Sequence, residues 1–213
     1  MSGLVLFSLV VMTLLLACAP SKDNMFIIGQ TLLNGTWRGV LVATGVCLGI
    51  GIYASIAGVF IGLALFYEPD WLVWLKVLGI GFLTYLAFGL MNSMGERLEY
   101  GEPIKGDREG MAGGMAIILS RPSFILFFVA FFSQFLQANE GAWPMSAQLS
   151  VILLVFVGLF IGVYILLVAI AHQFGAGPFS RSWVHRVQNE LAKTKPFALL
   201  LLGVIFWITQ LGE

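Results

Sequence analysis

Charged residues are the scarcest class in this sequence. Only 10% of its 213 residues are charged, whereas soluble domains carry about 25%. Acidic and basic residues balance at 11 each, so the formal net charge is zero and no nucleic-acid partner is expected. Hydrophobic residues make up 59% of the chain. This composition is typical of a protein embedded in a lipid bilayer.

Motifs for metal, redox and nucleophilic chemistry are also missing. Cys18 and Cys47 are too few for a disulfide framework and lack zinc-type spacing, so we expect no metal and no cofactor. There is no Gly-x-Ser-x-Gly or His-rich motif, which argues against an enzyme of the hydrolase type. His172 and His185 fall near a polar segment and are expected to be solvated.

The first apolar run is interrupted in an unusual way. Residues 19–24 read Ala-Pro-Ser-Lys-Asp-Asn and separate the apolar runs 3–19 and 25–33. Pro20 lacks an N–H and its ring clashes with the preceding turn, and each of the two charges would cost roughly 2.5 to 3.5 kcal/mol at a bilayer centre. Such a break is tolerated only where it is buried in protein or lines a wet cavity. The sequence therefore predicts a discontinuous helix.

Two other interpretations of this first run are a secretory signal and a lipoprotein cleavage box at residues 15–18, Leu-Leu-Ala-Cys. Both favour basic residues ahead of the apolar run, and Met1-Ser2-Gly3 supplies none. We expect residues 3–19 to form part of a membrane span.

Further apolar segments complete a set of six expected spans. They are 39–67, 71–94, 110–139, 146–171 and 196–211. Residues 95–109 form a hydrophilic connection at the midpoint of the chain, and residues 174–195 have the pattern of a helix lying in the membrane interface.

The two halves of the chain share one feature. Each opens on an interrupted span with a Pro-Ser pair, Pro20-Ser21 in the first and Pro122-Ser123 in the second. A repeat of three spans is odd, so the second copy must be inverted. Inverted repeats with broken first helices are typical of secondary transporters, whose solute site lies between the repeats. A chance coincidence of two dipeptides is the alternative.

The predicted fold is therefore an all-α integral membrane protein. It has six transmembrane helices as two inverted three-helix repeats, each with its first helix broken at proline, within one domain, 1–213. Repeat 1 covers about 1–94, a cytoplasmic loop about 95–110, and repeat 2 about 111–213.

Basic residues occur only in alternate loops, and the loops at 68–70 and 138–144 hold none. The positive-inside rule then predicts a bacterial cytoplasmic (inner) membrane protein with both termini outside. The loop residues concerned are Arg38, Arg97, Lys105, Arg108, Arg181, Arg186, Lys193 and Lys195.

Taken together, these motifs resemble the LysE/RhtB family of amino-acid exporters over nearly the whole chain. Pro20-Ser21-Lys22-Asp23 stands where that family has Pro-Gly-Pro-Asn/Asp, and Arg121-Pro122-Ser123 stands where it has Asn-Pro-Lys. Both breaks thus carry a cation, and Ile118 replaces a frequent asparagine. Further matching positions are Lys76, Gly79, Phe82, Tyr85, Leu86, Phe127, Phe128, Gln134 and Phe135.

The resemblance implies a secondary transporter that exports amino acids or related small zwitterionic metabolites, with the proton as coupling ion. Glycines spaced for close helix approach are expected to serve helix packing and would allow a homodimer. They are Gly35, Gly39, Gly45, Gly49, Gly79 and Gly114. The alternatives are a non-transporting membrane binding or assembly protein and a dithiol redox carrier using Cys18 and Cys47.

Asp23 is the leading candidate for coupling, because a carboxylate at membrane depth is expensive and usually functional. Lys22 and Arg121 are expected to bind an anionic group on the solute, assisted by free N–H groups where each helix restarts. A purely structural charge cluster, or cations that snorkel to the interface, would explain the same residues. Other candidates to line the site are Ser21, Asn24, Gln30, Ser123 and Gln134.

Overall fold

The computed structural model describes residues 3–19, 21–68, 70–92, 107–137 and 143–175, and every regular element within them is a helix. The all-helical prediction is therefore confirmed. The helices are α1 (Gly3–Cys18), α2 (Lys22–Asn34), α3 (Thr36–Tyr67), α4 (Trp71–Asn92), α5 (Asp107–Leu119), α6 (Ser123–Gln134) and α7 (Met145–Gly175).

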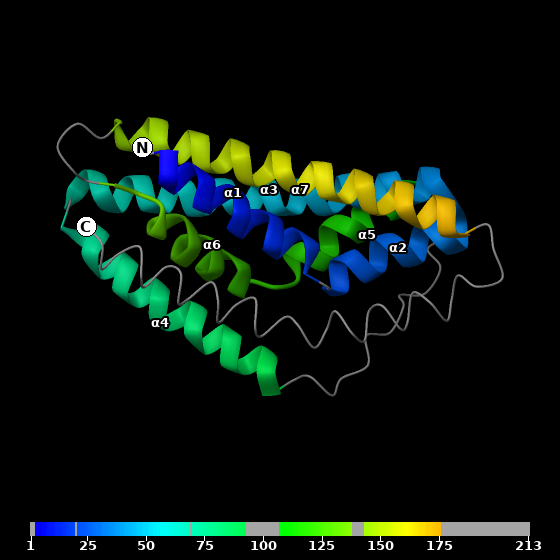
Figure 1. The fold of residues 1–213 in the computed structure, drawn as a ribbon, viewed down its shortest axis with the longest axis horizontal. Coiled ribbons are helices and arrows are strands. Elements are labelled where there is room, and N and C mark those ends of the chain that lie inside the picture. Colours follow the sequence, from blue (N-terminus) through cyan, green and yellow to red (C-terminus); the bar gives the residue numbers. More distant parts are fainter. Residues whose placement is uncertain (1–2, 20, 69, 93–106, 138–142, 176–213) are drawn as a thin grey trace.

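Two helices, α3 and α7, are each long and apolar enough to cross a membrane alone. With 32 and 31 residues, they extend about 48 and 46 Å at 1.5 Å per residue, more than the hydrocarbon core needs. They run side by side along the long axis of the molecule (Figure 1). Their length follows from uninterrupted apolar sequence.

Two further helix pairs are bent. The pair α1 and α2 bends by 53° and the pair α5 and α6 by 72°, and each pair passes as one broken span. The two interruptions predicted from sequence are thus both present. The described residues give up to four spans, with α4 a shorter apolar helix. The six-span count and its inverted repeat stay predictions, because the expected span 196–211 lies outside the described residues.

Several helix boundaries differ from the expected ones. Helix α5 begins at Asp107, inside the stretch expected to be loop, and α7 continues to Gly175, beyond the expected end at Ala171. The remainder of the expected interfacial segment, with His185, lies outside the described residues.

The first and second halves of the chain pack against one another. Helices α1 and α2 of the first half pack against α7 of the second, and α5 and α6 of the second half pack against α3 of the first. Helix α4 packs on α6 (Figure 1). Each broken pair therefore lies against the long helix of the other half, which brings the two breaks toward the centre.

Glycines make the tightest of these crossings possible. Where α3 meets α5, a Cβ added at Gly45 would overlap the Met111 carbonyl, and one at Gly114 would overlap the Val42 carbonyl. Backbones approach this closely only without side chains between them. Gly49 faces Ile118 in the same contact.

Gly35, expected to pack between helices, has a different role. Its φ of +89° lies in a region that L side chains rarely adopt, and a Cβ there would meet nothing within 4 Å. Its N–H bonds the Thr31 carbonyl and ends α2. Gly35 is thus the turn residue between α2 and α3, the position where glycine's conformational freedom is needed.

Candidate functional site

The two helix breaks meet in an ion pair. The Arg121 guanidinium, between α5 and α6, lies 3.3 Å from the Asp23 carboxylate in the first turn of α2. The Asp23 side chain is 8% exposed and that of Arg121 32%. Residues 98 positions apart in sequence therefore place opposite charges side by side inside the bundle, with the arginine the more accessible of the two.

The first break is stabilised locally. Asn24 is buried and donates its side-chain amide to the carbonyls of Ala17 and Ala19, at 3.0 and 2.9 Å. These carbonyls end α1 and would otherwise lack partners. Ser21 has extended backbone and its hydroxyl accepts from the Asn24 N–H, which is a serine N-cap on α2. Ser21 and Asn24 thus build the break.

The second break is stabilised by a side chain of a different helix. Tyr53 of α3 donates its hydroxyl to the Leu119 carbonyl at 2.8 Å, where α5 ends. Pro122, with φ −60°, precedes α6, a position where its missing N–H costs nothing. Ser123 begins α6 and is exposed. Tyr53 could not be identified from the sequence, because a tyrosine in an apolar span gives no sign of which carbonyl its hydroxyl reaches.

Aromatic rings link Arg121 to α7. Its guanidinium lies over the Phe124 ring, 5.6 Å from the centroid, a cation–π arrangement. Phe124 contacts Phe128, which packs edge-to-face on Phe156 at 5.3 Å. Phe160 then packs edge-to-face on Tyr164 at 5.6 Å. This row of rings fills the contact between α6 and α7 and fixes the position of Tyr164.

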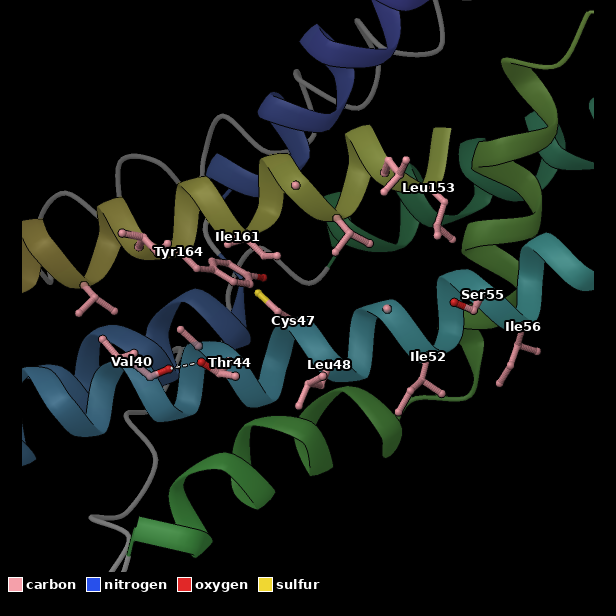
Figure 2. Close-up of a pocket in the computed structure, with 17 residues that line it drawn as sticks. Val40, Thr44, Cys47, Leu48, Ile52, Ser55, Ile56, Leu153, Ile161 and Tyr164 are labelled. Atoms are coloured by element: carbon pink, nitrogen blue, oxygen red, sulfur yellow. Dashed lines mark hydrogen bonds between the residues drawn. The ribbon is translucent and has the colours of Figure 1, made fainter. Parts of the chain in front are cut away.

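Tyr164 is a second residue that could not be identified from the sequence, because no spacing or motif singles it out. It is 2% exposed and faces Cys47 of α3 in a pocket between α3 and α7 (Figure 2).

Two predicted site residues lie away from the ion pair. Gln134 is at the far end of α6, about 17 Å from Ser123 at 1.5 Å per residue, and donates to the Lys76 carbonyl of α4 at 3.0 Å. Gln30 is buried and accepts from Asn34 at 2.6 Å. Pro20 and the Lys22 side chain lie outside the part of the chain that the structure describes.

Polar side chains outside the breaks hold helices together. Gln148 is fully buried, accepts from the Gln137 N–H, and donates to the carbonyls of Gln137 and Trp143. It thereby joins the start of α7 to the end of α6. His172 is exposed, as expected of a solvated residue, but its Nδ1 also hydrogen-bonds the Thr36 hydroxyl at 2.7 Å.

The cysteines and metal-ligating groups give no further site. Cys18 and Cys47 are free thiols, on α1 and α3 respectively. Within the described ranges no three histidine, cysteine or carboxylate side chains gather closely enough to hold a metal ion.

Replacing Asn24 by alanine tests the structural part of the first break. Two carbonyls at the end of α1 would lose their partner, so the free energy of unfolding should fall by about 1–3 kcal/mol. Thermal and denaturant unfolding of purified protein measure this loss. Ser150→Ala removes one exposed side-chain bond to Ser146 and should change stability by less than about 0.5 kcal/mol. Equal stability of the two variants would contradict the assignment.

Two long apolar helices, two broken apolar pairs and an ion pair that joins the breaks define a membrane protein with a polar site on discontinuous helices. The family model of the LysE type translocators matches residues 14–209, and the chain belongs to this family. The resemblance inferred from the motifs is confirmed. The family is one of membrane translocators, in agreement with a transport protein rather than an enzyme.

An uncharacterized membrane protein of Pseudomonas aeruginosa is 28% identical to this chain over 131 residues. The match covers 59% of this chain and 60% of that protein, so the chain spans less than two thirds of its relative's length. No solved structure matches the chain.

Proposed function

We propose that this protein exports amino acids or related small zwitterionic metabolites across the bacterial cytoplasmic membrane in exchange for protons. The observation that carries the proposal is the ion pair between Asp23 and Arg121, which joins the two helix breaks at 3.3 Å. Membership of the translocator family supports the transport class.

The chemistry of the pair matches that of a zwitterion. A free amino acid presents one carboxylate and one ammonium group close together. Arg121 suits the carboxylate because its guanidinium offers parallel donors, and Asp23 suits the ammonium. A zwitterion that inserts between the two side chains replaces the Asp23–Arg121 ion pair by two ion pairs, one between Arg121 and the solute carboxylate and one between Asp23 and the solute ammonium. Neither protein charge is then left buried without a counter-charge, the situation that costs most.

Proton coupling follows from the same competition. The Asp23 carboxylate accepts either the solute ammonium or a proton, but not both at once. Binding of the solute at Asp23 therefore displaces the proton, and departure of the solute lets Asp23 take up a proton again. Solute and proton thus occupy the carboxylate in turn, which is the requirement for exchange of solute against proton.

Flux measurements on purified protein in proteoliposomes test the proposal. Radiolabelled amino acids should move faster than in protein-free vesicles, and an imposed pH gradient of the correct direction should accelerate them several-fold. Accessibility to thiol reagents or to protease shows how much of the protein has inserted in each orientation. The same measurement tests whether both termini lie on the same side of the membrane. Absence of gradient-dependent flux for every amino acid tried would reject export and favour a binding or assembly role on the same scaffold.

A further inference from the structure

The Arg121 side chain lies at an open part of the second break. Its guanidinium reaches Asp23 through Nη2 at 3.3 Å, and the side chain is 32% exposed. Its neighbours in the chain, Ser120, Pro122 and Ser123, are all exposed. Arginine has a long flexible stem whose charged head moves toward polar surroundings where it can. The ion pair alone therefore does not fix the plane of the guanidinium.

The ring of Phe124 supplies the missing constraint. The guanidinium carbon, Cζ, lies over the face of this ring, 5.6 Å from its centroid, within the distance of about 6 Å at which a ring attracts a cation. Phe124 comes three residues after Arg121 and donates its N–H to the Arg121 carbonyl at 3.0 Å. The arginine side chain thus folds back over the first turn of α6.

Phe124 is itself held by the aromatic row between α6 and α7. Its ring contacts Phe127 edge-to-face at 6.4 Å and Phe128 at 6.3 Å, and it packs as a partly buried residue against the hydrophobic core. Phe128 in turn is buried and contacts Phe156 of α7. The ring under the guanidinium is therefore part of a packed helix contact, and packing of this kind holds a binding group in a defined geometry.

The backbone at this break is held separately. Tyr53 donates to the Leu119 carbonyl and so fixes the end of α5, two residues before Arg121. The freedom that remains at Arg121 is that of its side-chain torsions, which the contact with Phe124 limits.

The proposed exchange cycle has one state in which this contact matters most. When the solute has left and Asp23 carries a proton, Arg121 no longer faces a charged carboxylate. Without further support, its partly exposed guanidinium would turn toward polar surroundings and would not be aligned for the next solute. The Phe124 ring does not titrate, so its attraction for the guanidinium is the same in both protonation states of Asp23.

We propose that Phe124 is a positioning residue for Arg121. Its ring holds the guanidinium where the two breaks meet while no carboxylate is paired with it, and leaves the donors along the guanidinium edge free for the carboxylate of the solute. The role in solute binding rests on the proposed function. The hold of Phe124 on Arg121 is a property of the protein without solute.

Fluorinated phenylalanines test the proposal, because each added fluorine weakens the negative face of the ring with little change in its volume. Mono-, di- and trifluorophenylalanine replace Phe124 and, as the matched control, Phe127. The control residue is also partly buried on α6 and belongs to the same row, but it stacks on Phe131 at 5.7 Å. Flux of radiolabelled alanine in proteoliposomes gives KM and the maximal rate. Melting temperatures are measured without solute, with and without Arg121→Gln.

The KM for alanine should rise stepwise along the Phe124 series, reaching about fivefold with trifluorophenylalanine, the size of a cation–π contact of ordinary strength. The maximal rate should stay near that of the wild type. Phe124→Leu should raise KM to a similar extent, and Phe124→Tyr should keep it near the wild-type value. Fluorination at Phe124 should lower the melting temperature of the protein with Arg121 but not that of Arg121→Gln.

The control series should leave KM unchanged and should shift the melting temperature equally with and without Arg121. An unchanged KM along the Phe124 series, or the same rise along the Phe127 series, would overturn the role in solute binding. A melting-temperature shift at Phe124 that does not depend on Arg121 would overturn the contact itself. If no amino acid shows flux, export is rejected, and the melting temperatures still decide whether the ring holds Arg121.

Discussion

Replacing Arg121 by glutamine is expected to reduce amino-acid flux by at least about 100-fold. The substitution removes the group proposed to bind the solute carboxylate and takes the ion-pair partner away from the buried Asp23. Loss of one partner of a hydrogen-bonded charge pair weakens binding by about 2–5 kcal/mol, where each 1.4 kcal/mol is about a factor of ten, and it also lowers the stability of the fold. Proteoliposome flux and thermal unfolding, measured on the same preparations, give the two effects separately.

The double variant Asp23→Asn with Arg121→Gln distinguishes a functional pair from a structural one. With both members of the pair neutral, the buried position no longer holds a carboxylate that has lost Arg121, so the double variant should be more stable than Arg121→Gln alone. Flux should stay abolished and its response to a pH gradient should disappear. Recovery of flux together with stability would mean that the pair only holds the breaks together. Arg121→Lys keeps the charge but not the paired donors, so an intermediate flux is expected.

Introducing valine at Gly114 is expected to prevent assembly of the helix bundle. The added Cβ would overlap the backbone carbonyl of Val42, which cannot rotate away as a side chain could. Overpacking costs about 1–3 kcal/mol even where side chains can yield, and here α3 and α5 must separate. The yield of monodisperse protein and its melting temperature measure the effect.

Gly58→Val on α3 is the matched control, because a Cβ at Gly58 would meet nothing within 4 Å. It should leave yield and melting temperature unchanged. Normal assembly of Gly114→Val would show that the crossing of α3 and α5 is looser than the structure has it.

The breaks were predictable from the sequence because a helix that faces lipid tolerates few prolines and few charged residues. A proline beside Asp23 cannot continue a lipid-facing helix, and Arg121 beside Pro122 repeats the situation in the second half. Both residues are site candidates for that reason. Their pairing at 3.3 Å required the structure, since the sequence also allowed two separate cations at the interface.

The sequence could not say which polar side chains face a cavity and which face a neighbouring helix. Gln134 is predicted to line the site, yet it donates to a carbonyl of α4. An amide side chain in an apolar helix can hydrogen-bond either to a neighbouring helix or to groups in a cavity, and the sequence does not distinguish the two. Tyr53 and Tyr164 went unnoticed for the complementary reason. A tyrosine among leucines and isoleucines looks like packing until its hydroxyl is placed relative to other elements.

The two breaks differ in what holds them, and this has a consequence for how access could alternate. The carbonyls at the first are capped by Asn24 of the adjoining helix, so this capping is preserved when α1 and α2 move together. The second depends on Tyr53 of α3, so α5 can move only if α3 moves with it or if that hydrogen bond breaks. We therefore expect a conformational change at the second break to move α3 and α5 as one unit.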